Sequence, residues 1–170
     1  TLGVDQLAAV NLRLMDEGEP GDLFDEQLQV MITAQRDGLI GGIGLSNIDR
    51  AHLLHALEHT DIVCVQNPYN LVDRSTQPVL DECAARGIAF VPFFPLGSAF
   101  VADNPVLGNP VVRRAAAELG HTPAQIALAW TLGVAPNVLL IPGTSSTAHL
   151  EENLAVADID LGEALRAELD

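Results

Sequence analysis

Five short, nearly uninterrupted apolar runs alternate with helical patterns along this chain, and that alternation limits the possible folds more than any other feature. Each run is short and apolar almost throughout, as in a strand buried on both faces of a parallel sheet. Strands that alternate with helices build right-handed βαβ units. The sequence therefore predicts an α/β fold, with strands at Ala8–Leu12, Ile40–Leu45, Ile62–Val65, Ile88–Pro92 and Val138–Ile141.

Helical periodicity fills the intervals between these runs. Within residues 22–37 the apolar residues recur on one helical face, and Gly38 then ends the helix. A second clear start lies at Thr122, where a Thr cap precedes Pro123 and Gln125 can complete a capping box. Further helices are predicted at residues 48–59, 77–86, 111–119, 146–157 and 163–169.

The number of units does not fit a closed barrel. A (β/α)8 barrel takes about 250 residues, whereas this chain has 170. An open doubly wound sheet would fit the length, but its Gly-rich turn should join a strand to a helix. The candidate turn, Gly41-Gly42-Ile43-Gly44, lies before or inside a strand. We therefore expect a single domain over residues 1–170 from which upstream strands are missing, leaving an exposed sheet edge.

Composition excludes several classes of partner. The chain has 23 acidic residues against 8 basic ones, all of them Arg, and a net charge of -15. This balance argues against nucleic acid and against an anionic membrane surface. No apolar run reaches the roughly 20 residues needed to cross a bilayer, and the start carries no signal-peptide pattern. Since its two cysteines lack metal-site spacing, we expect a protein with reduced thiols that is found in the cytoplasm. The sequence contains no Lys and is rich in Ala and Arg, which suggests that it comes from a bacterium with a GC-rich genome.

Three histidines, His52, His55 and His59, follow the spacing of metal ligands on a helix. No Cys or carboxylate converges on them in the sequence pattern, so a solvated helix surface is the better interpretation, and we expect no metal site.

Polar residues follow each of the last four strands, at the edge where α/β folds bind ligands. Amides and hydroxyls there suit a carboxamide, and one aromatic ring offers a flat face for a heteroaromatic ring. The last turn opens a helix whose free N–H groups attract phosphate. Together these groups outline a dinucleotide site made of Ser46, Asn47, Gln66, Phe93, Pro95, Leu96, Gly97, Ser98, Gly143, Thr144 and Ser145.

Each of these residues also has a purely structural interpretation. Ser46 or Asn47 can simply cap the helix that follows, and Ser145 or Ser146 can likewise be only a cap. A phenylalanine such as Phe93, considered in isolation, is more often part of the core than of a cofactor site. The Gln66 side chain can simply form hydrogen bonds with buried backbone groups. A helical face formed by His149, Glu152 and Asn153 is, by itself, usually solvated.

Five segments, taken together, resemble the aldo-keto reductase superfamily in order and spacing across essentially the whole chain. They read GGIGLSN at 41–47, VQNPYN at 65–70, VPFFPLGS at 91–98, TPAQIALAW at 122–130 and IPGTSSTAHLEEN at 141–153. The resemblance implies a TIM (β/α)8 barrel, of which this chain would be the C-terminal five βα units. It also implies NADP-dependent reduction of a small-molecule carbonyl to an alcohol, with NAD as a possible cofactor.

The resemblance also assigns roles to individual residues. The nicotinamide carboxamide would be held by Ser46, Asn47 and Gln66. Phe93 would stack on the nicotinamide ring, and residues 95–98 would lie alongside the pyrophosphate. The adenosine phosphate and adenine would lie against Gly143, Thr144, Ser145, His149, Glu152 and Asn153. His149 stands where many members carry a cation for the 2′-phosphate of NADP, and an imidazole is only partly charged near neutral pH.

Two departures concern catalysis. Family members use a Tyr acid assisted by Lys, Asp and His; this chain has no Lys, and its one tyrosine, Tyr69, does not match the catalytic motif. The Tyr, Lys and Asp would lie upstream of this chain. Arg13 stands where the catalytic His is expected. An Arg cannot shuttle a proton, but it can polarise a carbonyl oxygen or hold an acidic substrate; its structural alternative is a salt bridge to Asp16.

Three functions therefore stay open from the sequence. The first is an active reductase whose other strands come from the rest of its chain. The second is a non-catalytic nicotinamide-nucleotide-binding or regulatory protein. The third is a truncated relic that binds nothing. The chain alone is expected to turn over weakly or not at all and to self-associate through its exposed edge.

Overall fold

A computed structural model describes residues 3–15, 18–98 and 103–170 of the chain. It divides into two compact units, each presented by itself below. The N-terminal unit contains residues 1–67 and 76–91, and the C-terminal unit contains residues 68–75 and 92–170. The expectation of one domain stays a prediction.

The N-terminal unit is built on a parallel sheet whose strands follow each other in chain order. This arrangement confirms the predicted α/β class and four of the five predicted strands. In register, Arg13 pairs with Ser46 and Ser46 pairs with Gln66, so three polar residues meet at one edge. The strands are β1 (Leu7–Arg13), β2 (Ile40–Ser46), β3 (Ile62–Gln66) and β4 (Ala89–Phe90).

The prediction of a fifth strand at 138–141 is wrong. Val138 forms a single β-bridge, and residues 139–141 form no strand. A strand needs hydrogen-bonded neighbours along its length, and the single bridge at Val138 does not continue into residues 139–141. The fourth strand is also shorter than predicted, covering two residues in place of five.

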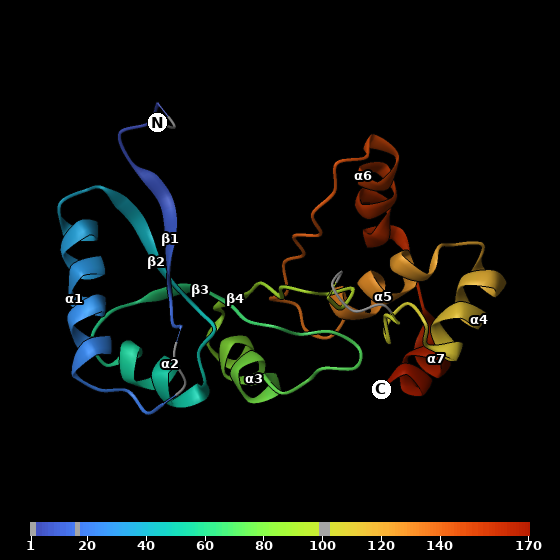
Figure 1. Cartoon of the computed structure of the whole chain (residues 1–170), viewed down its shortest axis with the longest axis horizontal. Coiled ribbons are helices and arrows are strands. Elements are labelled where there is room, and N and C mark those ends of the chain that lie inside the picture. Colours follow the sequence, from blue (N-terminus) through green and yellow to red (C-terminus); the bar gives the residue numbers. More distant parts are fainter. Residues whose placement is uncertain (1–2, 16–17, 99–102) are drawn as a thin grey trace. The chain divides into compact units, whose positions relative to one another are not determined.

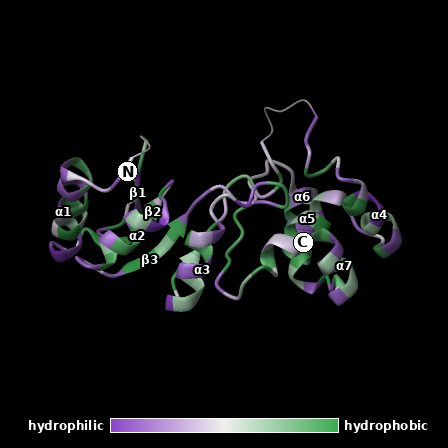
Figure 2. Ribbon diagram, turned by 90° about the horizontal axis from the view of Figure 1, so that it is seen from below, coloured by the Kyte–Doolittle hydropathy of each residue, from purple (hydrophilic) through white to green (hydrophobic). Residues whose placement is uncertain are grey.

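Three helices belong to the N-terminal unit. They are α1 (Asp22–Arg36), α2 (Arg50–Leu57) and α3 (Gln77–Arg86). Figure 1 shows α1 running beside β1 and β2. Its buried residues, Phe24 and Leu28, lie one turn apart, which gives the helix one apolar face. In Figure 2 this helix carries both colours, whereas β3, an inner strand of the sheet, is mostly green.

The remaining helices belong to the C-terminal unit and surround α5. The capping box predicted at Thr122 is present, since Gln125 N donates to Thr122 Oγ1 over 3.2 Å and Thr122 N donates to Gln125 Oε1 over 3.0 Å. Seven residues of α5 are buried, so this helix forms the centre of the unit. The helices are α4 (Pro110–Leu119), α5 (Pro123–Leu132), α6 (Thr147–Leu154), the 3-10 turn η1 (Ala155–Asp158) and α7 (Gly162–Leu169).

An aromatic cluster completes this core. The Tyr69 ring stacks on Trp130 with centroids 6.1 Å apart, and the Arg74 guanidinium lies 4.5 Å from the centroid of the Trp130 ring. Arg74 also donates to the carbonyl oxygens of Leu169 and Asp170, over 2.7 and 2.9 Å. Segment 68–75 is thereby tied to α5 and to the end of α7. Within the described residues, no helix combines the length and apolar character required to cross a membrane.

Candidate functional site

The first part of the candidate site lies at the carboxyl edge of the sheet in the N-terminal unit. Arg13 ends β1 and its Nη1 donates to Ser46 Oγ over 3.3 Å. Ser46 is 2% exposed and ends β2 in register with both Arg13 and Gln66. The partner that the sequence suggested for Arg13, Asp16, lies outside the described residues. The bond to Ser46 ties the Arg13 side chain to the edge of the sheet.

A second chain of hydrogen bonds runs across the same strands. Cys64 Sγ donates to Asn11 Oδ1 over 3.3 Å, and Asn11 Nδ2 donates to Gln66 Oε1 over 2.9 Å. Burial raises the pKa of the Cys64 thiol, so the group stays protonated at neutral pH and can act as the donor. Because Oε1 of Gln66 is turned to Asn11, its Nε2 is the group left to donate to a ligand oxygen.

Gly44 makes this network possible. A Cβ at residue 44 would lie 1.9 Å from Asn11 Oδ1 and 2.7 Å from Cys64 Sγ. Only a residue without a side chain lets the Asn11 amide lie across β2 toward β3. The glycines of this segment therefore serve close approach between strands, which differs from a phosphate-binding turn.

Asn47 lies next to this network in an uncommon backbone conformation. Its φ is 58°, a left-handed value that Asn tolerates better than most residues. Its N–H donates to Gln66 O and its Nδ2 donates to Leu14 O, both over 3.0 Å. The turn thus ties β1, β2 and β3 together where their polar side chains meet.

The capping interpretation of Ser46 and Asn47 is wrong. The residue that caps α2 is Asp49, whose Oδ1 accepts from His52 N over 2.9 Å. Burial acts to raise the pKa of Asp49, but hydrogen bonds from the His52 backbone and ring outweigh it, and the pKa lies below its ordinary value. Ser46 and Asn47 are therefore not required to start the helix.

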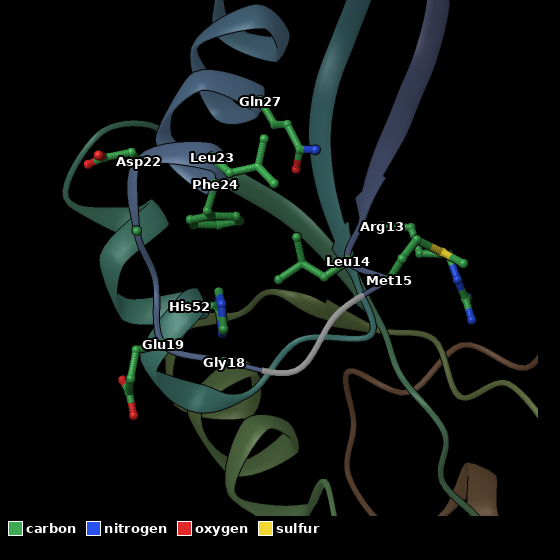
Figure 3. A pocket seen from close by; sticks show the side chains of 11 residues that line it. Arg13, Leu14, Met15, Gly18, Glu19, Asp22, Leu23, Phe24, Gln27 and His52 are labelled. Atoms are coloured by element: carbon green, nitrogen blue, oxygen red, sulfur yellow. The ribbon is translucent and has the colours of Figure 1, made fainter.

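A cavity of about 320 Å³ lies beside β1, where Leu14, Phe24 and His52 contribute to its wall. Figure 3 shows Leu14 pointing toward Phe24 while the Arg13 side chain extends away from them. Arg13 also lines this cavity, so the residue that donates to Ser46 borders both the polar strand edge and the cavity.

The second part of the candidate site lies in the C-terminal unit and begins at Phe93. The Phe93 and Phe94 rings are 5.2 Å apart and nearly perpendicular. Phe94 has a φ of 57°, a left-handed value that strains the backbone of a bulky residue. Its side chain is 48% exposed, so an apolar ring faces solvent at this turn. A cavity of about 390 Å³ is lined by Phe93, Phe94, Pro95, Leu96, Gly97, Ile141, Pro142 and Gly143.

A larger cavity, of about 570 Å³, adjoins the first one. The two cavities share Leu96, Pro142 and Gly143 in their walls and so adjoin each other, and together they make up the groove of this unit. A Cβ at Gly143 would meet nothing within 4 Å, which leaves open space above this turn. The other lining residues are Leu107, Arg113, Thr122, Pro123, Ala124, Thr144, His149, Glu152 and Asn153.

The groove ends against the first turn of α6. Ser146 caps this helix, since His149 N donates to Ser146 Oγ over 3.4 Å, and Thr144 Oγ1 accepts from Ser146 N over 3.1 Å. The expectation that Ser145 or Ser146 caps this helix is therefore confirmed, with Ser146 as the capping residue. Gln125 Nε2 donates to Glu152 O over 3.1 Å and fixes α6 against α5.

Sequence reasoning missed two residues of these sites. Asn11 is a polar residue two positions before Arg13 in an otherwise apolar strand, and the two-residue period of a strand could have found it. Arg113 lines the groove from α4 and its Nε donates to Leu107 O over 3.1 Å. Nothing in the local pattern of α4 distinguishes Arg113 from a solvated residue.

The predicted cofactor residues thus fall into two groups. Ser46, Asn47 and Gln66 meet with Arg13 in the N-terminal unit. In the C-terminal unit the groove is lined by Phe93, Pro95, Leu96, Gly97, Gly143, Thr144, His149, Glu152 and Asn153. Ser98 and Ser145 line neither cavity. The binding roles of all these residues stay predictions.

Comparison with known proteins places these features in a family. A family model described as "Aldo/keto reductase family" matches residues 1–170. The chain is 44% identical to the pyridoxine 4-dehydrogenase of Escherichia coli K12 over 99% of its own length and 58% of the relative. It is 36% identical to an uncharacterized oxidoreductase of Schizosaccharomyces pombe, over 99% of this chain and 53% of that protein. The chain thus spans little more than half the length of these relatives.

Solved structures give the same assignment. A thermostable aldo-keto reductase in complex with the inhibitor epalrestat matches with a TM-score of 0.83 and 32% identity, over 98% of this chain and 60% of that one. An aldo-keto reductase from Klebsiella pneumoniae in complex with NADPH matches with a TM-score of 0.82 and 27% identity, over 98% and 58%.

Proposed function

The chain belongs to the aldo/keto reductase family, and from that premise we propose that it forms the cofactor-binding part of an NADP-dependent oxidoreductase. The proposed reaction is reduction of a small-molecule carbonyl group to an alcohol. The activity is a proposal because the chain spans little more than half of its curated relatives. Support comes from the E. coli relative, named a dehydrogenase, and from the K. pneumoniae enzyme, solved with NADPH.

The observation that carries the proposal is the groove of the C-terminal unit. It runs from the aromatic Phe93 to the first turn of α6, where N–H groups and the helix dipole favour phosphate. Arg113 and His149 line the same end. A permanently charged guanidinium suits the 2′-phosphate that distinguishes NADP from NAD. Arg113 and His149 therefore fit NADP. Glu152 and Asn153 line the same cavity and offer hydrogen-bond acceptors and donors for the adenosine.

The polar network of the N-terminal unit, taken by itself, fits the chemistry of a carboxamide group. A carboxamide offers one acceptor oxygen and two donor hydrogens. Gln66 Nε2 is oriented to donate because its Oε1 accepts from Asn11. We assign carboxamide binding to Ser46, Asn47 and Gln66, and a positioning role to Asn11.

Arg13 is the chain's own residue for the substrate. NADPH, when bound, supplies the hydride. We assign to the Arg13 guanidinium the stabilisation of negative charge on the substrate oxygen, as oriented donors do elsewhere. Its bond to Ser46 Oγ would hold it at the strand edge. Tyr69 is 1% exposed and stacked on Trp130, so we assign it a packing role and no proton transfer.

A second candidate function is binding of the nucleotide without turnover. It is favoured by Arg13, which stands in place of a titratable His and already contacts Ser46. In that case the same groove and network would serve regulation.

Partners and surroundings complete the proposal. In the sheet order β1 lies at one end, so its outer edge would take a strand from the rest of the protein or from a second copy. Cys64 and Cys83 are both free thiols, which suits a reducing compartment, and we propose the cytoplasm of a bacterium.

The decisive experiment is a fluorescence titration with NADPH and NADH. We expect saturable NADPH binding, weaker NADH binding, and about a tenfold loss of NADPH affinity in Arg113→Gln, since charge-assisted hydrogen bonds contribute about 1.5–3 kcal/mol. Arg36→Gln, on an exposed face of α1, is the matched control. Binding that is equal for the two cofactors and unchanged in Arg113→Gln would refute the cofactor assignment. Oxidation of pyridoxine with NADP+, measured on a protein that also contains the upstream strands, then separates the two functions, because only the enzyme turns over.

A further inference from the structure

Three ligating side chains meet on two helices of the N-terminal unit, and none of them belongs to the groove or to the strand-edge network. Asp25 lies in the first turn of α1, His55 lies in α2 and His59 follows its end. One ligand atom from each lies within 4.8 Å of the other two. His55 Nε2 is 2.5 Å from Asp25 Oδ1, and the rings of His55 and His59 are 5.0 Å apart.

We propose that Asp25, His55 and His59 bind a divalent transition-metal ion, with Zn²⁺ as the expected occupant. Two imidazoles and one carboxylate are a ligand set that zinc accepts, and water can fill the fourth position. Nickel and copper would compete, because imidazole also suits them.

The geometry requires only small movements. Ligand atoms around tetrahedral zinc are about 3.3 Å apart when metal–ligand bonds are about 2.0–2.1 Å long. The Asp25–His55 pair would open from 2.5 Å, while the longest separation would shorten from at most 4.8 Å. Asp25 and His59 are exposed and His55 is half-buried, so their side chains can make these adjustments. His59 lies in the turn directly after α2, where its N–H donates to Ala56 O over 3.0 Å.

Packing between α1 and α2 supports the three ligating side chains. The Phe24 ring lies 5.1 Å from the His52 ring and 6.0 Å from the His55 ring, so α1 packs directly on α2. Asp49 caps α2 just before these residues. A net charge of -15 on the chain also draws divalent cations toward its surface.

The site differs from the histidine triplet noted in the sequence. His52 is 6% exposed and its Nδ1 lies 2.8 Å from Asp49 Oδ1, so it is occupied elsewhere. The expectation that no carboxylate converges on these histidines is wrong, because Asp25 approaches from 30 residues away in sequence. A bound ion would cross-link α1 and α2 and stabilise the N-terminal unit by mass action.

Isothermal titration with ZnCl₂, on protein without a histidine tag, tests the proposal. We expect one ion per chain, and an increase in Tm of about 5–11 °C when zinc exceeds its Kd by about one hundredfold. His59→Gln removes a ligand but leaves the Asp25–His55 hydrogen bond in place. It should weaken zinc binding by about tenfold or more, as should Asp25→Asn.

His121→Gln is the matched control, because this histidine precedes α5 in the other unit and should leave zinc affinity unchanged. Visible absorbance of bound Co²⁺ provides an independent readout of coordination. Zinc affinity that is equal in the parent protein and in His59→Gln would overturn the proposal, and so would the absence of saturable binding. Either result would leave Asp25 and His55 as a simple interhelical hydrogen bond.

Discussion

Replacing Gly44 by Ala should break the network that orients Gln66. The new Cβ would lie 1.9 Å from Asn11 Oδ1 and 2.7 Å from Cys64 Sγ, where ordinary contacts begin near 3.4 Å. The Asn11 amide must therefore move by roughly 1.5 Å. That movement removes its 2.9 Å bond to Gln66 and its 3.3 Å bond from Cys64.

The expected cost follows from these contacts. Two part-buried hydrogen bonds contribute about 0.5–1.5 kcal/mol each, and overpacking of a strand contact costs about 1–3 kcal/mol. The loss of glycine freedom in the unfolded chain offsets about 0.4–1 kcal/mol. Gly44→Ala should therefore lower the free energy of unfolding of the N-terminal unit by about 2–4 kcal/mol. It should also weaken NADPH binding, since Gln66 loses its orienting partner.

The assay is urea unfolding followed by circular dichroism, together with hydrogen exchange of residues 40–46. Tryptophan fluorescence is unsuitable because Trp130 lies in the other unit. Asn11→Ala and the double variant Gly44→Ala/Asn11→Ala complete a double-mutant cycle. We expect the double variant to lose clearly less than the sum of the single losses, because removing the amide relieves the clash. Losses that add within about 0.5 kcal/mol would refute the reasoning.

Two further predictions concern helix starts. Thr122→Ala should cost about 1 kcal/mol of the free energy of unfolding of the C-terminal unit, because it removes the cap of the buried helix α5; Trp130 fluorescence in urea measures it, and an unchanged midpoint would contradict it. Because folding lowers the pKa of Asp49, its ionised carboxylate should stabilise the folded protein. That contribution is present above pH 3.8, the ordinary pKa of the group, and is lost as the pH falls through the pKa of Asp49 in the folded protein. Unfolding of the parent protein and of Asp49→Asn between pH 3 and 7 checks this sign, and a difference that grows toward low pH would exclude it.

Local sequence patterns predicted the elements well because each depends on its own residues. The capping residues at Thr122 and the apolar face that contains Phe24 and Leu28 depend on neighbours a few positions away. The polar edge at Ser46 and Gln66 was also predictable, because the ends of parallel strands meet at one edge. Strand pairing is different, since Val138 and the residues after it form a strand only where a neighbour is present.

The residues that the sequence missed share one property. Asn11 reaches Gln66 across 55 positions, and Asp25 reaches His55 across 30. Neither contact follows from helical or strand periodicity, because each depends on how separate elements pack. Arg113 is of the same kind, since it joins the groove only through the position of α4. Long-range packing therefore decided the parts of the sites that local patterns left open.

The cluster of Tyr69, Arg74 and Trp130 has a consequence for biosynthesis. Residues 68–75 leave the ribosome before residues 76–91, which complete the sheet, yet they become part of the core around α5. The C-terminal unit is thus discontinuous in the gene. A gene fragment starting at residue 92 would encode Trp130 without its aromatic and cationic neighbours, so the two units cannot be separated by a single cut in the DNA.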